Sequence, residues 1–295
     1  MITGGIGSSS TVEVYNPVSR RTCLVTKLSD ARKFHTLCGG LLCGGGDYCS
    51  SHCRVYGYGH EAKKCQKWTP YKFENTSVTL KNVRNNHLCW EIDNGVLLLG
   101  GDEANEAKSS KTTELVVGDG SSSVSRFDLI FQATDSCGID REDGTYVITG
   151  GQNEEKRVVV YTTTGFKNNL PDLLVGRYKH SCSKFVTRKG QMALVVTGGR
   201  TAADSKPMTS TEMYIDGSWS TVPAYLPVGV ISASCVTLDN QVFLFGGTDG
   251  SQRQAQILKL TPAGGSYRWE GAGVMKDSKS DHAVGVIPEV SRICP

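Results

Sequence analysis

The feature that most constrains this chain is a short apolar segment that ends in a pair of glycines and recurs along the whole length. One copy, LVVTGG, spans residues 194–199. An apolar, β-favouring run that ends at residues tolerant of positive φ is typical of a buried strand followed by a tight turn. Repeats spaced 40 to 56 residues apart predict one four-stranded sheet per repeat. The first glycines of the six copies are Gly4, Gly44, Gly100, Gly150, Gly198 and Gly246.

A second pattern precedes the glycine pairs: Leu or Met, then Arg or Lys four residues later, then His three residues further on. The copy at Leu226, Val230 and Ala233 keeps only the spacing, and the remaining repeat offers Asp135 where the His is expected. Because the pattern recurs, we predict that these residues occupy equivalent positions in each repeat, where the innermost strand begins. The four complete copies are Leu28, Arg32 and His35; Leu80, Arg84 and His87; Leu173, Arg177 and His180; and Met275, Lys279 and His282.

Further strands are predicted downstream of the glycine pairs, because alternating or β-branched runs occur at 11–15, 113–116, 157–161, 211–214 and 256–260. Trp68, Trp219 and Trp269 indicate a fourth, outer strand in three repeats. With these motifs in register, the chain resembles the kelch-repeat β-propellers over essentially its whole length. The resemblance implies an all-β, six-bladed kelch-type propeller that forms a single domain over residues 1–295. Residues 282–287 are then expected to pair with residues 1–3 and close the ring, which removes an unpaired sheet edge.

Charge and hydropathy exclude several classes of function. The net charge of +3 is the small difference between 32 basic and 29 acidic residues, so it gives no case for binding nucleic acid or an anionic membrane. No apolar run is long enough to span a bilayer. Since Met1 stands in a predicted strand, a signal peptide is expected to be either absent or already removed from the numbered chain.

The 11 cysteines are many for a reduced compartment and favour disulfides in an extracellular, secreted protein. Cys137 with Cys182, and Cys38 with Cys89, fall on neighbouring inner strands and are candidates to bridge adjacent blades. Other candidates are Cys65 with Cys53 or Cys49, and Cys23 with Cys43 across one blade boundary. Buried free thiols packed between blades are the simpler alternative, and the odd count leaves at least one cysteine outside an internal disulfide.

Two other features bear on compartment and metal content. A zinc site built from Cys49, His52, Cys53, His60 and Cys65 is an alternative use of the cysteines, but the cluster lacks a clear second ligand pair. The sequon at Asn75 predicts N-glycosylation on a surface loop, which agrees with secretion. No metal and no cofactor is therefore expected.

The candidate catalytic residues give little support for an enzyme. The repeated His residues are expected to lie around one mouth of the channel, but a ring of equivalent positions is too wide for one metal. Each His and Arg is therefore expected to tie its blade to the next through hydrogen bonds to loop backbone. The copper radical oxidases that resemble galactose oxidase need a His, Tyr and Cys set that cannot be matched here. Asp47, Asp102 and Asp249 would suit a glycosidase, although an Asp that follows a glycine ordinarily caps a turn.

The loops after the glycine pairs are expected to gather on one face of the disc, and they are polar and variable in length. Loops on a rigid scaffold commonly carry recognition, and Arg200, Asp204 and Lys206 lie in the longest of them. We therefore predict a non-catalytic binding or scaffold module for a protein or glycan partner, acting alone or within an oligomer or larger extracellular assembly. The alternatives are a metal-dependent oxidase or hydrolase that uses the channel mouth, and an intracellular kelch adaptor.

Overall fold

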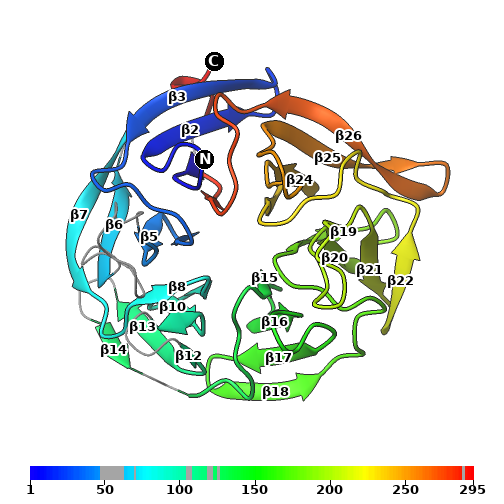
Figure 1. The fold of residues 1–295 in the computed structure, drawn as a ribbon, viewed down its shortest axis with the longest axis horizontal. Coiled ribbons are helices and arrows are strands. Elements are labelled where there is room, and N and C mark those ends of the chain that lie inside the picture. The colour runs from blue at the N-terminus through cyan, green and yellow to red at the C-terminus, as the bar shows by residue number, and fades with distance from the viewer. Residues whose placement is uncertain (47–62, 70, 104–107, 118–121, 125–126, 288–289) are drawn as a thin grey trace.

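The protein is a six-bladed β-propeller, in which six antiparallel four-stranded sheets surround a central axis (Figure 1). The computed structural model describes residues 1–46, 63–69, 71–103, 108–117, 122–124, 127–287 and 290–295. Each blade runs from an innermost strand at the axis to an outer strand at the rim. The blades are numbered here in the order in which their glycine pairs occur.

Blade 1 contains, from the axis outward, β27 (Ala283–Val284), β1 (Ile2–Thr3), β2 (Thr11–Asn16) and β3 (Arg21–Lys27). Blade 2 contains β4 (Thr36–Cys38), β5 (Leu41–Cys43), β6 (Lys64–Thr69) and β7 (Lys72–Thr79). Blade 3 contains β9 (Leu88–Ile92), β10 (Gly95–Leu99), β13 (Thr113–Val117) and β14 (Ser122–Val124).

Blade 4 contains β15 (Cys137–Asp140), β16 (Thr145–Thr149), β17 (Val158–Thr162) and β18 (Gly165–Asn169). Blade 5 contains β19 (Ser181–Val186), β20 (Met192–Thr197), β21 (Thr211–Ile215) and β22 (Ser218–Val222). Blade 6 contains β23 (Ser234–Leu238), β24 (Gln241–Phe245), β25 (Gln256–Ala263) and β26 (Ser266–Val274).

Two smaller elements complete the description. A three-stranded sheet of β12 (Lys108–Ser109), β11 (Asp102–Glu103) and β8 (Arg84–Asn85) lies above blade 3, and the short helix α1 (Val290–Ile293) follows the last blade. Within the described residues, no helix has the length and apolar character needed to cross a membrane.

The ring closes between the two ends of the chain, as predicted. In blade 1 the C-terminal strand β27 pairs with β1, with Ile2 opposite Val284 and Thr3 opposite Ala283. Each predicted glycine-pair strand is the second strand of its blade. One strand assignment was wrong: Trp219 and Trp269 lie on outer strands, whereas Trp68 lies on β6, the third strand of blade 2.

The core is divided among the joins between blades. One hydrophobic cluster fills each of the six joins, for example that of Leu97, Ile148 and Val159 between blades 3 and 4, and that of Ile2 and Phe245 between blades 6 and 1. Each second strand is apolar on both faces because it contacts a neighbouring blade on each side. The packing between blades therefore fixes the loops at both ends of the disc.

Candidate functional site

One backbone contact joins every pair of neighbouring blades on what is here called the upper face, where the loops after the glycine pairs meet the segments before the inner strands. The second glycine of each pair donates its N–H to a carbonyl of the next blade's leading segment, for example Gly5 to Arg32 at 2.8 Å and Gly151 to Arg177 at 3.1 Å. Ala133 and Val230 accept the same bond in the joins where the basic residue is missing, at 2.9 and 2.8 Å. The repeated positions are thus structural joints.

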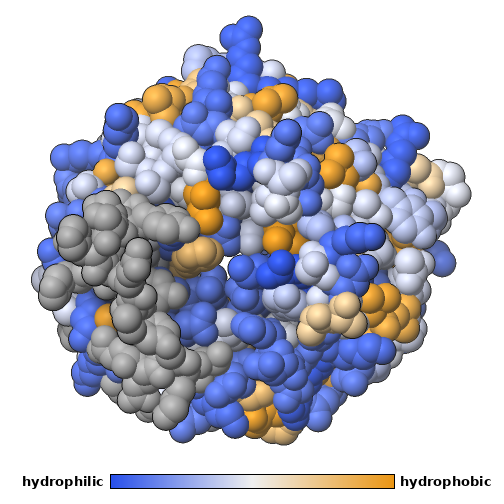
Figure 2. Space-filling view, in the orientation of Figure 1, coloured by the Kyte–Doolittle hydropathy of each residue, from blue (hydrophilic) through white to orange (hydrophobic). Residues whose placement is uncertain are grey.

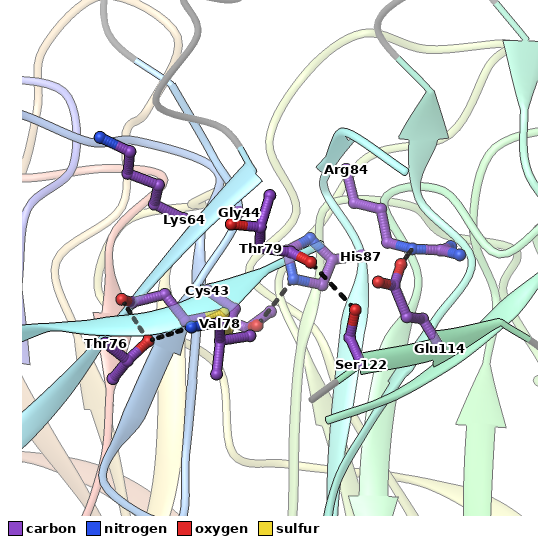
Figure 3. The surroundings of a disulfide bond; sticks show 12 residues. Cys43, Gly44, Lys64, Thr76, Val78, Thr79, Arg84, His87, Glu114 and Ser122 are labelled. Atoms are coloured by element: carbon purple, nitrogen blue, oxygen red, sulfur yellow. Dashed lines mark hydrogen bonds and ion pairs between the residues drawn. A yellow bond between two sulfur atoms is a disulfide. The ribbon is translucent and has the colours of Figure 1, made fainter. Parts of the chain in front are cut away.

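The basic side chains of the repeat are fully buried and paired with carboxylates that the sequence analysis did not connect to them. Arg84 lies 3.4 Å from Glu114, as Figure 3 shows. Arg177 lies 2.6 Å from Glu212, and no member of either pair is exposed. Lys279 lies 3.1 Å from Glu13 and secures the closing blade. The signal was present in the sequence, since a third-strand Glu occurs in three of the repeats that keep the basic residue.

The repeated His residues bind threonine hydroxyls rather than loop backbone. His35 Nε2 lies 2.9 Å from Thr3 Oγ1, His87 Nε2 lies 2.8 Å from Thr36 Oγ1, and His180 Nε2 lies 2.9 Å from Thr149 Oγ1. In each case the threonine belongs to the preceding blade, so the predicted role in tying blades together stands. The fourth, His282, has neither ring nitrogen hydrogen-bonded.

These imidazoles stay neutral at physiological pH. Burial, with a smaller contribution from the adjacent basic residue, lowers the pKa of His35, His87, His180 and His282 to about 3. Among the described residues, no group of three or more His, Cys, Asp or Glu side chains is placed to hold a metal ion. The repeated histidines therefore serve the joints between blades.

Asp135 does not stand at the His position, which corrects the sequence alignment by one residue. Ser136 packs against Gly151 in the same way as His180 packs against Gly199 in the next blade: a Cβ added to either glycine would meet that side chain first. Ser136 is therefore the residue at the His position. Asp135 instead belongs to a set of six residues, one per blade, that precede the His position and have φ between 50° and 59°. This set is here called the axial ring: Phe34, Asn86, Asp135, Lys179, Ser232 and Asp281.

The axial ring is held by backbone hydrogen bonds from blade to blade around the axis. Phe34 donates to the carbonyl of Asp281 at 3.0 Å, Asp281 donates to Ser232 at 3.0 Å, and Lys179 donates to Asp135 at 2.9 Å. Because consecutive members belong to consecutive blades, members three apart face each other across the axis. Asp135 thus lies opposite Asp281, and Phe34 lies opposite Lys179.

The axial ring surrounds the mouth of a cavity of about 270 Å³ on the propeller axis. Deeper in, the walls carry His180, His282, the Tyr146 ring and the inner-strand cysteines. Figure 2 shows a largely hydrophilic surface around a hollow near the centre of the disc. The cavity mouth, here called the axial mouth, is therefore ringed mainly by polar residues, above walls that also carry apolar side chains.

Charged groups of both signs meet at the axial mouth. Asp135 lies 4.0 Å from the Lys179 ammonium group, and its side chain is only 10% exposed. Burial raises the pKa of Asp135 to about 6, helped by Asp102 and Asp281 and opposed by Lys179 and Arg200. The Lys179 ammonium also lies 6.0 Å from the centre of the Phe34 ring, on the far side of the axis.

The three predicted binding residues separate into two groups. Arg200 does not line the cavity but lies near enough to Asp135 to affect its pKa; its guanidinium stacks over Tyr178 at 5.0 Å, and its Nε has no hydrogen-bond partner. Asp204 and Lys206 are exposed farther along the loop, where Asp204 accepts the Lys206 N–H at 3.0 Å within the turn. The loop prediction did not include the axial-ring residues, which lie beside Arg200.

Two of the four disulfides among the described residues connect neighbouring blades, and both were predicted. Cys38 bonds to Cys89, and Cys137 bonds to Cys182, each across neighbouring inner strands as expected. The other expectations were wrong: Cys65 bonds to Cys43, directly opposite on β5 and β6, and Cys23 bonds to Cys294. Four disulfides favour an oxidising, extracellular environment. Cys235 is the free cysteine of the described residues, and the zinc alternative with Cys49, His52, Cys53 and His60 lies mostly outside those residues.

The remaining candidate positions have ordinary structural settings. Asn75 lies on the exposed outer strand β7 rather than on a loop, and its Oδ1 accepts a hydrogen bond from Gln66 at 2.9 Å. Asp249 caps its own turn by accepting the Gln252 N–H at 2.7 Å. Asp102 accepts a bond from Thr134 at 3.1 Å, and Asp47 lies outside the described residues.

Comparison with known proteins supports the fold alone. No protein-family model matches the sequence, and no curated protein matches it. Among solved structures, a similar one is that described as "Structure of YjhT", with a TM-score of 0.67 and 12% identity over 85% of this chain and 87% of that chain. At this identity the likeness extends to the propeller architecture only.

Proposed function

We propose that this chain is a secreted, kelch-type propeller that acts without catalysis as a recognition or scaffold module for a protein or glycan. The observation that carries the proposal is the upper face: a polar surface held by a blade-to-blade bond at every join, on a frame in which the Cys38–Cys89 and Cys137–Cys182 disulfides join neighbouring blades. A rigid frame lowers the entropy lost on binding, so polar loops on it can recognise a partner at little ordering cost.

The structural roles of the buried side chains also support recognition rather than catalysis. Three of the four repeated histidines are hydrogen-bonded in the joints, all four are neutral, and the buried basic residues are paired with carboxylates. Among the described residues, Arg200 with Tyr178 and the axial ring are polar groups of the upper face that these joints do not use. An arginine stacked on an aromatic ring is pre-organised to bind carboxylate or hydroxyl groups of a partner.

Binding of the oxidised protein to a glycan array and to a panel of extracellular protein domains tests this proposal. We expect saturable binding that Arg200→Glu weakens at least tenfold, because the change reverses a charge near the axial mouth. Arg188→Glu is the matched control, since Arg188 is exposed in the β19–β20 turn on the opposite face. Equal loss in both variants, or no saturable binding to either class, would contradict the proposal.

A further inference from the structure

The axial mouth holds a buried ion pair beside a buried polar side chain that the fold does not satisfy. Asp135 forms a 4.0 Å ion pair with Lys179, and its side chain is nine-tenths buried. His282 is 5% exposed, lines the same cavity, and has both ring nitrogens without a partner. Buried polar groups are nearly always hydrogen-bonded, so these atoms indicate a missing donor at this place.

The contacts of Lys179 show what kind of donor the mouth accommodates. Its ammonium group lies between the Asp135 carboxylate and the face of Phe34, at 4.0 and 6.0 Å. Lys33 approaches the same ring at 5.4 Å. A carboxylate beside an aromatic face is a combination that selects cations, and Asp281 adds a second carboxylate from the opposite side of the axis.

Hydrogen-bond geometry favours a ligand over the tethered lysine. A charge-assisted N–H···O bond is normally about 2.7–2.9 Å long, so Lys179 at 4.0 Å does not supply one to Asp135. Lys179 starts from a backbone held at φ 54° and bonded into the axial ring, which fixes where its side chain begins. A free primary ammonium has three donors on a compact head and is under no such constraint.

We propose that the axial mouth binds the primary ammonium group of a ligand, which displaces the Lys179 side chain and seats between Asp135, Asp281 and the Phe34 ring. This inference rests on the recognition role proposed above and assigns the chemical class of group that the mouth accepts. His282, beside Asp281, offers a neutral acceptor for one of the remaining N–H donors. The ammonium group belongs either to a small amine or to a lysine side chain of a partner.

Protonation of Asp135 gives the site a pH dependence. The charged groups that face Asp135 are Lys179 and Arg200, which favour its ionised form, and Asp102 and Asp281, which oppose it. Its pKa of about 6 means that the carboxylate is ionised at pH 7.5 and largely protonated at pH 5. Ammonium binding should therefore weaken over this interval.

Calorimetry on the oxidised protein of residues 1–295 tests the site with two probes, butylamine for a small amine and Nα-acetyl-lysine amide for a peptide lysine. Nε-acetylation of the second probe removes the charge and serves as the ligand control. We expect Lys179→Met to bind the amine probes more tightly than wild type, because it removes the internal competitor. In that background, Asp135→Asn and Asp281→Asn should each weaken binding about tenfold, in line with a lost hydrogen bond to a charged group.

The matched protein control is Asp204→Asn, which makes the same charge change on the same face away from the mouth and should leave affinity unaltered. Tighter binding of the lysine probe would indicate a partner side chain, and tighter binding of butylamine a small metabolite. Equal affinity for the acetylated probe, unchanged affinity in both Asn variants, or no binding to Lys179→Met would overturn the proposal. If the amines fail while Arg200→Glu still abolishes partner binding, the ammonium site is rejected and the recognition face remains.

Discussion

The buried pair of Arg177 and Glu212 offers a direct test of how the blades are held. Glu212 is completely buried, lies 2.6 Å from Arg177 and accepts the backbone N–H groups of Leu174 and Val175 at 2.8 and 3.1 Å. Glu212→Leu would leave a buried guanidinium without its counter-ion. Removing one partner of such a pair typically costs about 3–5 kcal/mol, and we expect a loss of unfolding free energy in this range.

The chain itself supplies the compensating change. In blade 6 the position of the arginine is Val230 and the position of the glutamate is Leu258, and these two residues pack in one hydrophobic cluster. The double variant Arg177→Val with Glu212→Leu should therefore recover at least ~2 kcal/mol relative to the sum of the two single variants, because no uncompensated charge remains.

The recovery will be incomplete for a reason visible in the contacts. Arg177 also donates to the carbonyls of Gly198 at 2.8 Å and Ser210 at 3.3 Å, and each loses a donor in the double variant. A buried acceptor without its partner costs about 1–3 kcal/mol. Urea unfolding of the oxidised proteins, followed by tryptophan fluorescence, measures all four members of the cycle. Strictly additive losses would refute the view that this ion pair acts as a unit.

Of three further predictions, two concern stability and one concerns disulfide formation. Because burial lowers the pKa of the four repeated histidines to about 3, the unfolded chain binds more protons between pH 6.5 and 3 and stability falls as the pH decreases through this window. His282→Asn should reduce that slope by up to ~1.4 kcal/mol per pH unit, and parallel urea-midpoint profiles for the two proteins would contradict the assignment. Gly150→Ala should destabilise the protein more than Gly190→Ala, since a Cβ at Gly150 would lie 2.3 Å from a backbone oxygen and one at Gly190 would meet nothing within 4 Å. Thermal unfolding of the two variants measures the difference. Equal shifts in melting temperature would count against close packing at the glycine pair. Ser181→Cys should form a disulfide with Cys235, because Ser181 and Cys235 begin neighbouring inner strands as the bonded Cys137 and Cys182 do, and thiol titration under denaturing conditions should then show one fewer free thiol than in wild type.

The repeated motifs made the architecture predictable from the sequence, and the misses have specific physical causes. The glycine pairs predicted all six second strands, because each glycine adopts positive φ at a point where a Cβ would collide with a segment that precedes an inner strand: that of the next blade for the first glycine and that of its own blade for the second. The bond between Cys23 and Cys294 spans 271 residues and depends on where the segment after the last blade lies, which no local pattern encodes.

The candidate site was harder to predict than the fold. The sequence analysis assigned Asp135 to the His position, which Ser136 in fact occupies. The error arose because this repeat has no His to mark the position, and spacing alone could not show which residue takes the left-handed conformation. Arg200 was identified from loop length, whereas the axial ring comes from segments that looked like strand leaders. Sequence reasoning locates residues along the chain, and convergence on the axis emerges only when all six blades are assembled.

Comparing the six repeats of this chain distinguishes positions that serve the fold from positions that serve function. At the basic, His and glycine positions the same residue types recur because each joint between blades makes the same contacts. At the axial ring the backbone demand is equally uniform, with φ between 50° and 59° in every blade, and Asn or Asp would be the least strained choice outside glycine. Three blades nonetheless use Phe34, Lys179 and Ser232, where each carries a cost of about 1–2 kcal/mol for the left-handed conformation. Two of these side chains offset part of the cost, because Lys179 forms a 4.0 Å ion pair with Asp135 and its ammonium group lies 6.0 Å from the centre of the Phe34 ring. The departures from Asn and Asp therefore bring an aromatic face and a cation beside a carboxylate at the axial mouth.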